Sequence, residues 1–123
     1  MIIENSSDLI RTWQLVTLSD GSEVAEAELV NGAALVISPD TLALFRAPGD
    51  CNHPLRGGFL RSTTFDAEQA PEAPFIEEHR AGFVGLTGGG VLLIGLNEVR
   101  MYPGRDDALR NRNVLCEMSL APE

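Results

Sequence analysis

The residues of this chain that could do chemistry fall into two short clusters. The first is Asp50-Cys51-Asn52-His53 with Arg56 nearby, which places a thiol two residues from an imidazole. Such a pair can ligate a metal, with His79 or a carboxylate completing the shell, or can form a thiolate–imidazole nucleophile. No further Cys or His stands at ligand spacing, so we expect a tight loop between strands. We therefore expect no metal and no cofactor.

The second cluster is Glu77-Glu78-His79-Arg80, which offers carboxylates beside a histidine. A carboxylate and an imidazole in an apolar pocket can transfer protons. In a regular strand Glu77 and His79 share one face. If that face points inward, it is an acid–base site; we expect it to point outward, because buried charges are costly. His53, His79 and Glu77 are the candidate catalytic residues.

The elements that must position these clusters are short strands, indicated by alternating apolar residues between turn signals. Asn31-Gly32 and Pro39-Asp40 are turns, Gly88-Gly89-Gly90 is a hairpin turn, and residues 47–54 and 66–74 are loops. Residues 23–30 suit an edge strand or a helical turn, and residues 106–112 suit a loop or a helical turn. We expect strands over residues 12–18, 33–38, 41–46, 59–65, 75–80, 83–87 and 114–120, with the longest apolar run at 91–102.

This pattern predicts an all-β fold of eight to nine strands, forming one mainly antiparallel barrel. The chain of 123 residues has the length of one domain, and we predict a single domain over residues 1–123. We see no repeat of fixed period and no linker that would divide the chain.

The composition of the chain limits the classes of partner that it could bind. The formal net charge is −9, and all nine basic residues are arginine. This charge argues against nucleic acid and anionic membranes but permits a basic protein partner. No apolar run is long enough for a membrane span, and the N-terminus does not resemble a signal peptide. We expect a cytoplasmic protein in which Cys51 and Cys116 are reduced, with Cys116 in the core.

Two family resemblances follow from the first sixty residues. Arg11-Thr12-Trp13 resembles the Gly-x-Trp signature of lipocalins, with arginine at the glycine position. Over residues 9–46 the order Thr12-Trp13, Asp20-Gly21, Ala27-Glu28-Leu29 is similar to that of small bacterial lipocalin-like domains. This resemblance implies a calycin-type barrel, with Trp13 as a plug and a late arginine packed over it. The candidates for that arginine are Arg100, Arg110 and Arg112.

The rival resemblance is to the META domain of heat-shock-associated bacterial proteins. That family has a Gly-Cys-Asn segment to which Asp50-Cys51-Asn52 is similar, and the likeness continues to Phe59. It also implies a small antiparallel barrel. Neither resemblance implies a catalytic set.

We therefore expect a non-enzymatic domain that binds a small apolar ligand or is purely structural. One alternative is a small-barrel enzyme, of the cyclase or isomerase type, that uses a pocket acid–base pair. Another is an inhibitor or immunity-type protein that presents Asp66, Glu68, Glu72, Glu77 and Glu78 to a basic partner. A homodimer would follow if the run Val91–Leu96 were exposed. The candidate cavity residues are Trp13, Leu15, Leu35, Ile37, Leu44, Phe59, Phe83 and Tyr102.

Overall fold

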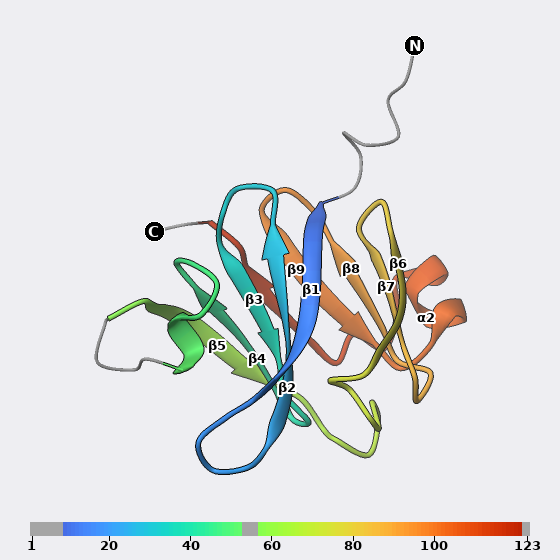
Figure 1. The fold of residues 1–123 in the computed structure, drawn as a ribbon. Helices are drawn as coiled ribbons and strands as arrows, with labels where there is room; N and C mark the ends of the chain where they lie inside the picture. Colours follow the sequence, from blue (N-terminus) through green and yellow to red (C-terminus); the bar gives the residue numbers. More distant parts are fainter. Residues whose placement is uncertain (1–8, 53–56, 122–123) are drawn as a thin grey trace.

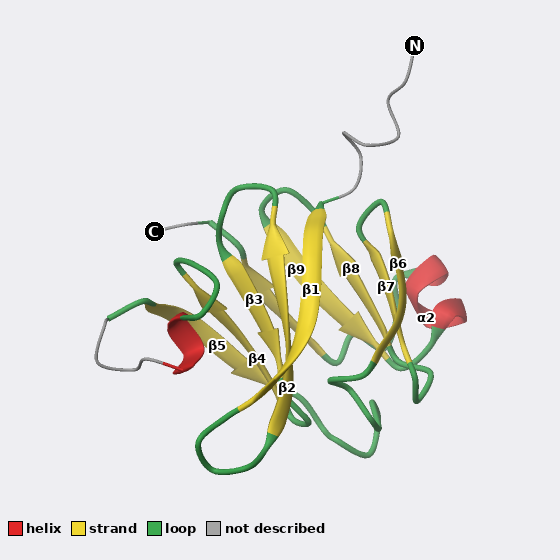
Figure 2. Ribbon diagram, in the orientation of Figure 1, coloured by secondary structure: helices red, strands yellow, loops and turns green. Residues whose placement is uncertain are grey.

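The computed structural model describes residues 9–52 and 57–121. Figures 1 and 2 show that strands dominate these ranges, with two short helices on opposite flanks. The elements are β1 Ile10–Thr17, β2 Glu23–Leu29, β3 Ala34–Ile37, β4 Thr41–Phe45, η1 Asp50–Asn52, β5 Phe59–Thr64, β6 Ile76–Arg80, β7 Phe83–Leu86, β8 Val91–Ile94, β9 Glu98–Tyr102, α2 Arg105–Arg110 and β10 Cys116–Ser119.

The strands form two antiparallel sheets of five strands each. The first has the order β1-β2-β3-β4-β5 and the second β10-β9-β8-β7-β6, so each sheet is a meander of consecutive strands. The predicted all-β antiparallel class is confirmed. The ladders define two sheets, whereas the sequence pattern predicted eight or nine strands in one. Arg61 links the sheets where β5 meets β10, because its Nη1 donates to the carbonyls of Ser119 at 3.0 Å and Ala121 at 2.6 Å.

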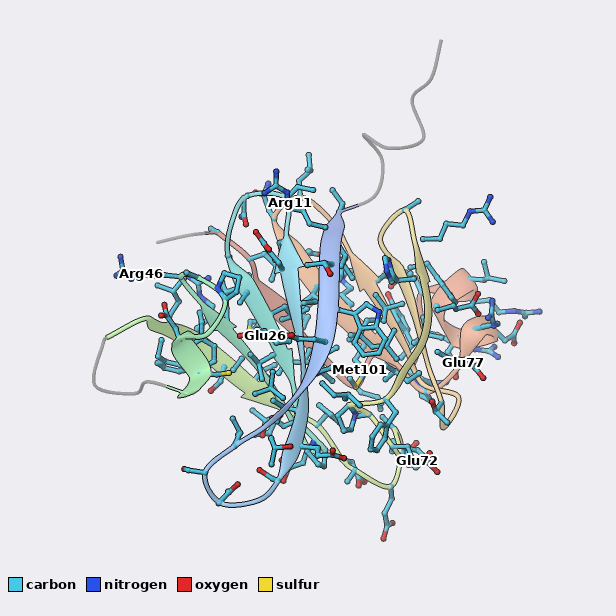
Figure 3. The ribbon with its side chains drawn as sticks, viewed as in Figure 1. Arg11, Glu26, Arg46, Glu72, Glu77 and Met101 are labelled. Carbon is cyan, nitrogen blue, oxygen red and sulfur yellow. The ribbon has the colours of Figure 1, made fainter. Side chains whose placement is uncertain are left out.

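Aliphatic side chains from both sheets fill the space between them. Strands β3 and β8 lie at the centre of their sheets, and both are buried for most of their length. Alternate residues of each strand point inward, as the two-residue period of a strand requires. Figure 3 places Met101 between the sheets. The largest fully buried members of this core are Leu35, Ile37, Leu42, Leu44, Leu86, Leu92, Met101, Leu120 and Val84.

The two sheets repeat one pattern of pairing. In the first sheet Leu35 of β3 is opposite Ala27 and Leu44; in the second, Leu92 of β8 is opposite Val84 and Met101. Each residue from β2 to β4 is separated from its equivalent between β7 and β9 by the same number of residues. The equivalences include Leu29 with Leu86, Gly32 with Gly89, Ile37 with Ile94, and Phe45 with Tyr102.

Irregular features repeat as well. The register of β1 on β2 shifts between Ile10 and Thr12, and that of β6 on β7 shifts between Ile76 and Glu78. In both cases the residue before the shift is an isoleucine, which is opposite the last leucine of the neighbouring strand. A β-bulge is a specific feature rather than a random defect, so its recurrence supports a true internal repeat.

The turns confirm this equivalence. Gly32 donates its N–H to Leu29 at 2.9 Å with a φ of 92°, and Gly89 donates to Leu86 at 3.0 Å with a φ of 102°. Positive φ is the conformation that favours glycine in such hairpins. The expectation that the chain holds no repeat is therefore wrong. The two halves share apolar pattern and turn geometry but few identical residues.

The observed strand pairing and helix positions test four further predictions. Residues 23–30 contain strand β2, which lies between β1 and β3 and is therefore not an edge strand. The apolar run 91–102 contains two strands, β8 and β9, joined by a turn at residues 95–97. Residues 106–112 contain part of helix α2. The predicted pair of strands around Pro39-Asp40 is confirmed as β3 and β4.

Residues 66–75 connect the two sheets and cover one end of the core. Ala70 and Ala73 of this segment are fully buried in the core cluster. Gly88 must be glycine here, since a Cβ at that position would overlap the carbonyl oxygen of Pro71. In Figure 1 this segment crosses the bottom of the molecule, opposite the β2–β3 and β8–β9 turns at the top.

No helix in the described part of the chain has the length and apolar character needed to cross a membrane.

Leu35→Ala and Leu92→Ala test the equivalence of the two inner faces. Both leucines are fully buried at equivalent positions, so each change should lower the free energy of unfolding by about 2–5 kcal/mol. Urea denaturation monitored by circular dichroism measures this. Leu96→Ala is the control, because Leu96 is exposed and its change should stay within about 0.5 kcal/mol. A cost for Leu92→Ala as small as that of the control would contradict the shared core.

Candidate functional site

The structure does not bring the predicted cavity residues together. Leu35, Ile37 and Leu44 are fully buried in the packed core, and Trp13 is half-buried against it. Leu15 and Phe59 are 44% and 55% exposed. Phe83 and Tyr102 belong to a separate cluster on the outer face of the second sheet, with Val91 and Ala108. In the described residues, the middle of the molecule is therefore filled by side chains.

The predicted acid–base residues are also separated. His53 lies outside the described residues. His79 is half-buried and is opposite Val84, so it lies on the inner face of β6. The expectation that His79 points outward is therefore wrong. Glu77 falls at the bulge and is exposed, and Figure 3 shows it at the periphery. The prediction that Glu77 and His79 share a face assumed regular alternation, which the bulge breaks.

The late arginines are held by other partners. Arg100 bonds to Glu98 at 2.9 Å and Glu117 at 3.1 Å. Arg110 and Arg112 lie 3.3 Å and 3.0 Å from Asp106. In the described chain, the cation–π contact that the structure records is between Arg105 and Phe83, with 4.7 Å from the guanidinium carbon to the ring centre.

The acidic surface proposed for a basic partner is present as exposed side chains. Asp66, Glu68, Glu72, Glu77 and Glu78 are all exposed, along residues 66–75 and strand β6. Glu78 is paired with Arg105, and Asp66 accepts the N–H of Glu68 at 2.9 Å. Two of the five carboxylates thus already interact with neighbouring groups of this chain.

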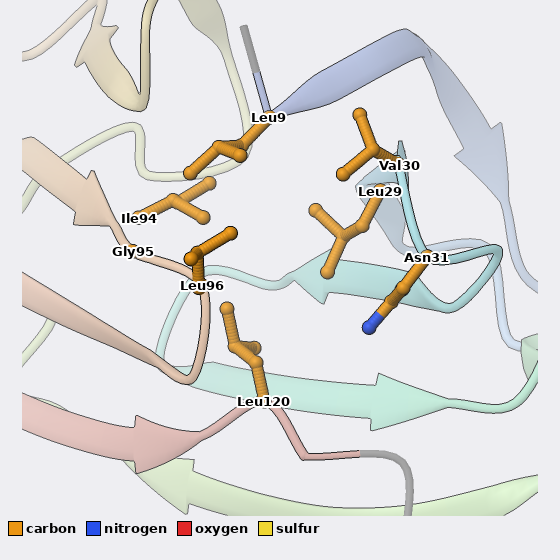
Figure 4. A pocket seen from close by; sticks show the side chains of 8 residues that line it. All are labelled: Leu9, Leu29, Val30, Asn31, Ile94, Gly95, Leu96 and Leu120. Atoms are coloured by element: carbon orange, nitrogen blue, oxygen red, sulfur yellow. The ribbon is translucent and has the colours of Figure 1, made fainter. Parts of the chain in front are cut away.

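An apolar pocket opens between the two sheets at the end opposite residues 66–75 (Figure 4). Its volume is about 60 Å³. The β2–β3 turn and the β8–β9 turn form two of its walls, and the chain before β1 and after β10 completes it. The lining residues are Leu9, Leu29, Val30, Asn31, Ile94, Gly95, Leu96 and Leu120.

Two features of this end pocket stand out chemically. Leu96 is 77% exposed at its rim, although it sits in a turn where polar residues are the norm. Asn31 supplies the polar side chain: its Oδ1 accepts the N–H of Ala33 at 2.9 Å, and Figure 4 shows its nitrogen directed toward the pocket. None of the predicted cavity residues lines this pocket. The sequence signal for it was an apolar residue inside the turn Gly95-Leu96-Asn97.

A second recess lies on the outer face of the first sheet, around Glu26. Glu26 is 4% exposed and is the one buried charged residue in the described chain. Its Oε1 accepts from Gln14 at 3.2 Å, and its Oε2 accepts from the Gly49 N–H at 2.7 Å and the Cys51 thiol at 3.6 Å. The recess, about 150 Å³, is also lined by Thr12, Glu28 and Pro48.

These contacts explain what Glu26 does locally. A buried carboxylate without hydrogen-bond donors would be costly. Here a β1 side chain and the loop after β4 supply three donors, so Glu26 attaches that loop to the sheet. Residues 23–30 were predicted to form an edge strand or a helical turn, and neither prediction placed a buried glutamate there.

The two cysteines do not form an activated nucleophile. Burial and the negative charge of Glu26 raise the pKa of Cys51 from 9.0 to about 11. Burial raises the pKa of Cys116 to about 11. A nucleophilic cysteine needs the opposite environment, one that lowers the thiol pKa. At neutral pH Cys51 is therefore a thiol that donates to Glu26.

The described residues do not converge on a catalytic arrangement. Within residues 9–52 and 57–121, no three His, Cys, Asp or Glu side chains come together as potential metal ligands. No family model matches this chain, and comparisons with curated proteins and with solved structures found no match. The end pocket and the recess at Glu26 are two features of the described residues from which a function can be argued.

Iodoacetamide labelling as a function of pH tests the Glu26–Cys51 contact. Only the thiolate reacts, so the labelling rate of Cys51 should rise with an apparent pKa near 11. Glu26→Gln removes the negative charge and should lower that apparent pKa. Cys116 is the internal control, since burial alone raises its pKa. Mass spectrometry of each cysteine peptide gives both rates, and an unchanged Cys51 profile in Glu26→Gln would refute the contact.

Stability at alkaline pH should follow from the same two pKa values. Both thiols have a folded-state pKa above the ordinary value of 9.0. Their stabilising contribution is therefore complete below about pH 9 and is lost as the pH rises toward 11. We expect the free energy of unfolding of the wild type to fall more steeply over this range than that of Cys51→Ala/Cys116→Ala. Parallel slopes in urea denaturation would contradict this expectation.

Proposed function

We propose that this chain is a non-enzymatic, lipocalin-like binding domain that holds a small apolar group in its end pocket. The observation that carries the proposal is the composition of that pocket. Leucine, isoleucine and valine side chains line it, Asn31 adds one polar group, and Leu96 remains exposed at the rim. An apolar pocket with few polar groups is typical of a ligand site.

The lipocalin-like, barrel-type arrangement is part of this proposal. On one side the two sheets meet at β5 and β10 through Arg61. On the other side Leu9, just before β1, lies beside Gly82 in the β6–β7 turn. These contacts bring the margins of the sheets together at two places, as expected of a flattened barrel.

The size of the pocket sets the size of the ligand. A water-sized group needs roughly 10–15 Å³ of such space, and the pocket offers about 60 Å³. It therefore suits a group of about four to six heavy atoms rather than a fatty acid or a polycyclic molecule. An enzyme of the cyclase or isomerase type has less support, because Glu77 and His79 do not form the acid–base pair it requires.

Titration with unbranched alcohols tests the proposed function. We expect saturable shifts of the methyl NMR signals of Leu29, Ile94 and Leu120 with 1-propanol and 1-butanol. Octanol should bind more weakly, because its chain exceeds the pocket. The physical reason is removal of apolar surface from water in a space of limited volume.

Two exposed leucines provide matched variants for this titration. Leu96→Asp places a carboxylate at the rim and should weaken 1-butanol binding at least tenfold. Leu109→Asp is the control, because Leu109 is 85% exposed on α2, away from the pocket. The proposal fails if 1-butanol gives no saturable shifts at these methyl groups, or if both variants weaken it equally.

A further inference from the structure

The internal repeat gives the end pocket a counterpart at the opposite end of the molecule. Val30 donates its N–H to Leu9 at 3.2 Å beside the pocket, and Thr87 donates to Phe75 at 2.8 Å at the other end. Likewise Leu120 donates to Asn97 at 2.8 Å, and Phe65 donates to Asp40 at 3.0 Å. The walls therefore correspond: Leu29 to Leu86, Ile94 to Ile37, Leu120 to Phe65, and Leu9 to Phe75.

The counterpart site is occupied by the protein itself. Residues 66–75 cross it and bury Ala70 and Ala73 completely, in the same core cluster as Ile37, Phe65 and Leu86. Ala70 Cβ lies 3.4 Å from where a Cβ on Gly90 would be. The occupant of this end is thus a segment of consecutive turns, with small apolar side chains three positions apart.

Comparison of the occupied end with the open end pocket also identifies a polar contact. At the occupied end the carbonyl oxygen of Pro71 lies against Gly88. Gly88 is equivalent to Asn31, whose amide nitrogen is directed toward the open pocket (Figure 4). A segment that crossed the open end in the same way would bring a backbone carbonyl to that nitrogen, which is a hydrogen-bond donor.

The two ends also differ in depth. Gly90 at the occupied end is equivalent to Ala33 beside the open pocket, where Ala33 is buried in the core cluster. The extra methyl group makes the open pocket shallower. It therefore fits the side chain of alanine or the ring of proline better than a longer aliphatic chain.

We propose that the ligand of the end pocket is a turn-forming peptide segment of a partner protein, with alanine and proline residues spaced as in residues 66–75. This inference rests on the proposed function and names its ligand class. The peptide inserts one small apolar side chain between Leu29 and Ile94, and one of its carbonyls accepts a hydrogen bond from Asn31 Nδ2. The acidic residues of residues 66–75 are exposed, so they take no part in this recognition.

The probe is an acetylated and amidated peptide with the sequence of residues 66–75. Asp66→Asn, Glu68→Gln and Glu72→Gln in this peptide remove charges that the acidic protein would repel. A control peptide carries Ala70→Asp and Ala73→Asp in addition. Methyl NMR of the full chain follows Leu29, Ile94 and Leu120. We expect saturable shifts that compete with 1-butanol, and binding of the control peptide at least tenfold weaker.

The Asn31→Asp variant distinguishes binding of the peptide from binding of a small apolar ligand. Aspartate keeps the oxygen that accepts from Ala33 and suits the same turn, but it lacks the Nδ2 donor. We expect the variant to bind the probe peptide at least tenfold more weakly, with 1-butanol binding unchanged within twofold.

Each outcome decides one of the two claims. If 1-butanol binds and the peptide does not compete, the ligand is not a peptide, while the proposed apolar site stands. If neither binds, both claims fail together. If the control peptide binds as well as the probe, or Asn31→Asp leaves peptide binding unchanged, the recognition described above is wrong.

Discussion

Contact between the inner faces of the two sheets is the interaction on which the rest of the molecule depends. Each sheet is a meander with one apolar face, and a meander of this kind is stable only when that face is covered. Leu35 and Leu92 occupy equivalent central positions and are fully buried. Because side chains fill the space between the sheets, a ligand has no room there. Binding is therefore displaced to the ends, where turns rather than strands form the walls.

The repeat also shows which parts of the molecule are constrained and which are free to change. The inner faces keep their aliphatic character from one half to the other. On the outer faces the halves diverge: Glu26 of β2 is equivalent to Phe83 of β7. Glu26 needs three hydrogen-bond donors, which fix the loop around Cys51, whereas Phe83 packs under the guanidinium of Arg105. The short helices that cover these faces, η1 and α2, are equivalent in position but differ in length.

Strand positions could be predicted from sequence because each strand follows a two-residue apolar period between Gly, Asn or Pro turns. The repeat was not apparent, since it preserves pattern and register rather than residue identity, and the β1–β2 connection is longer than the β6–β7 connection. Glu77 and His79 were placed on one face because a bulge has no sequence signature in a strand of charged residues. The end pocket depends on two turns far apart in sequence, so only the three-dimensional arrangement could bring Leu29 and Ile94 together.

The occupied and open ends differ in one thermodynamic respect. Residues 66–75 are joined covalently to both sheets, so their local concentration at their site is set by the chain itself. For a short tether that effective concentration lies in the millimolar range. A separate peptide making equivalent contacts at the shallower open end lacks this advantage and must also lose its own conformational freedom. Ala33 in place of Gly90 reduces the buried surface further. A partner that binds the open end at lower concentrations would therefore need contacts beyond the pocket, and the exposed rim residues Leu96 and Val30 are placed to provide them.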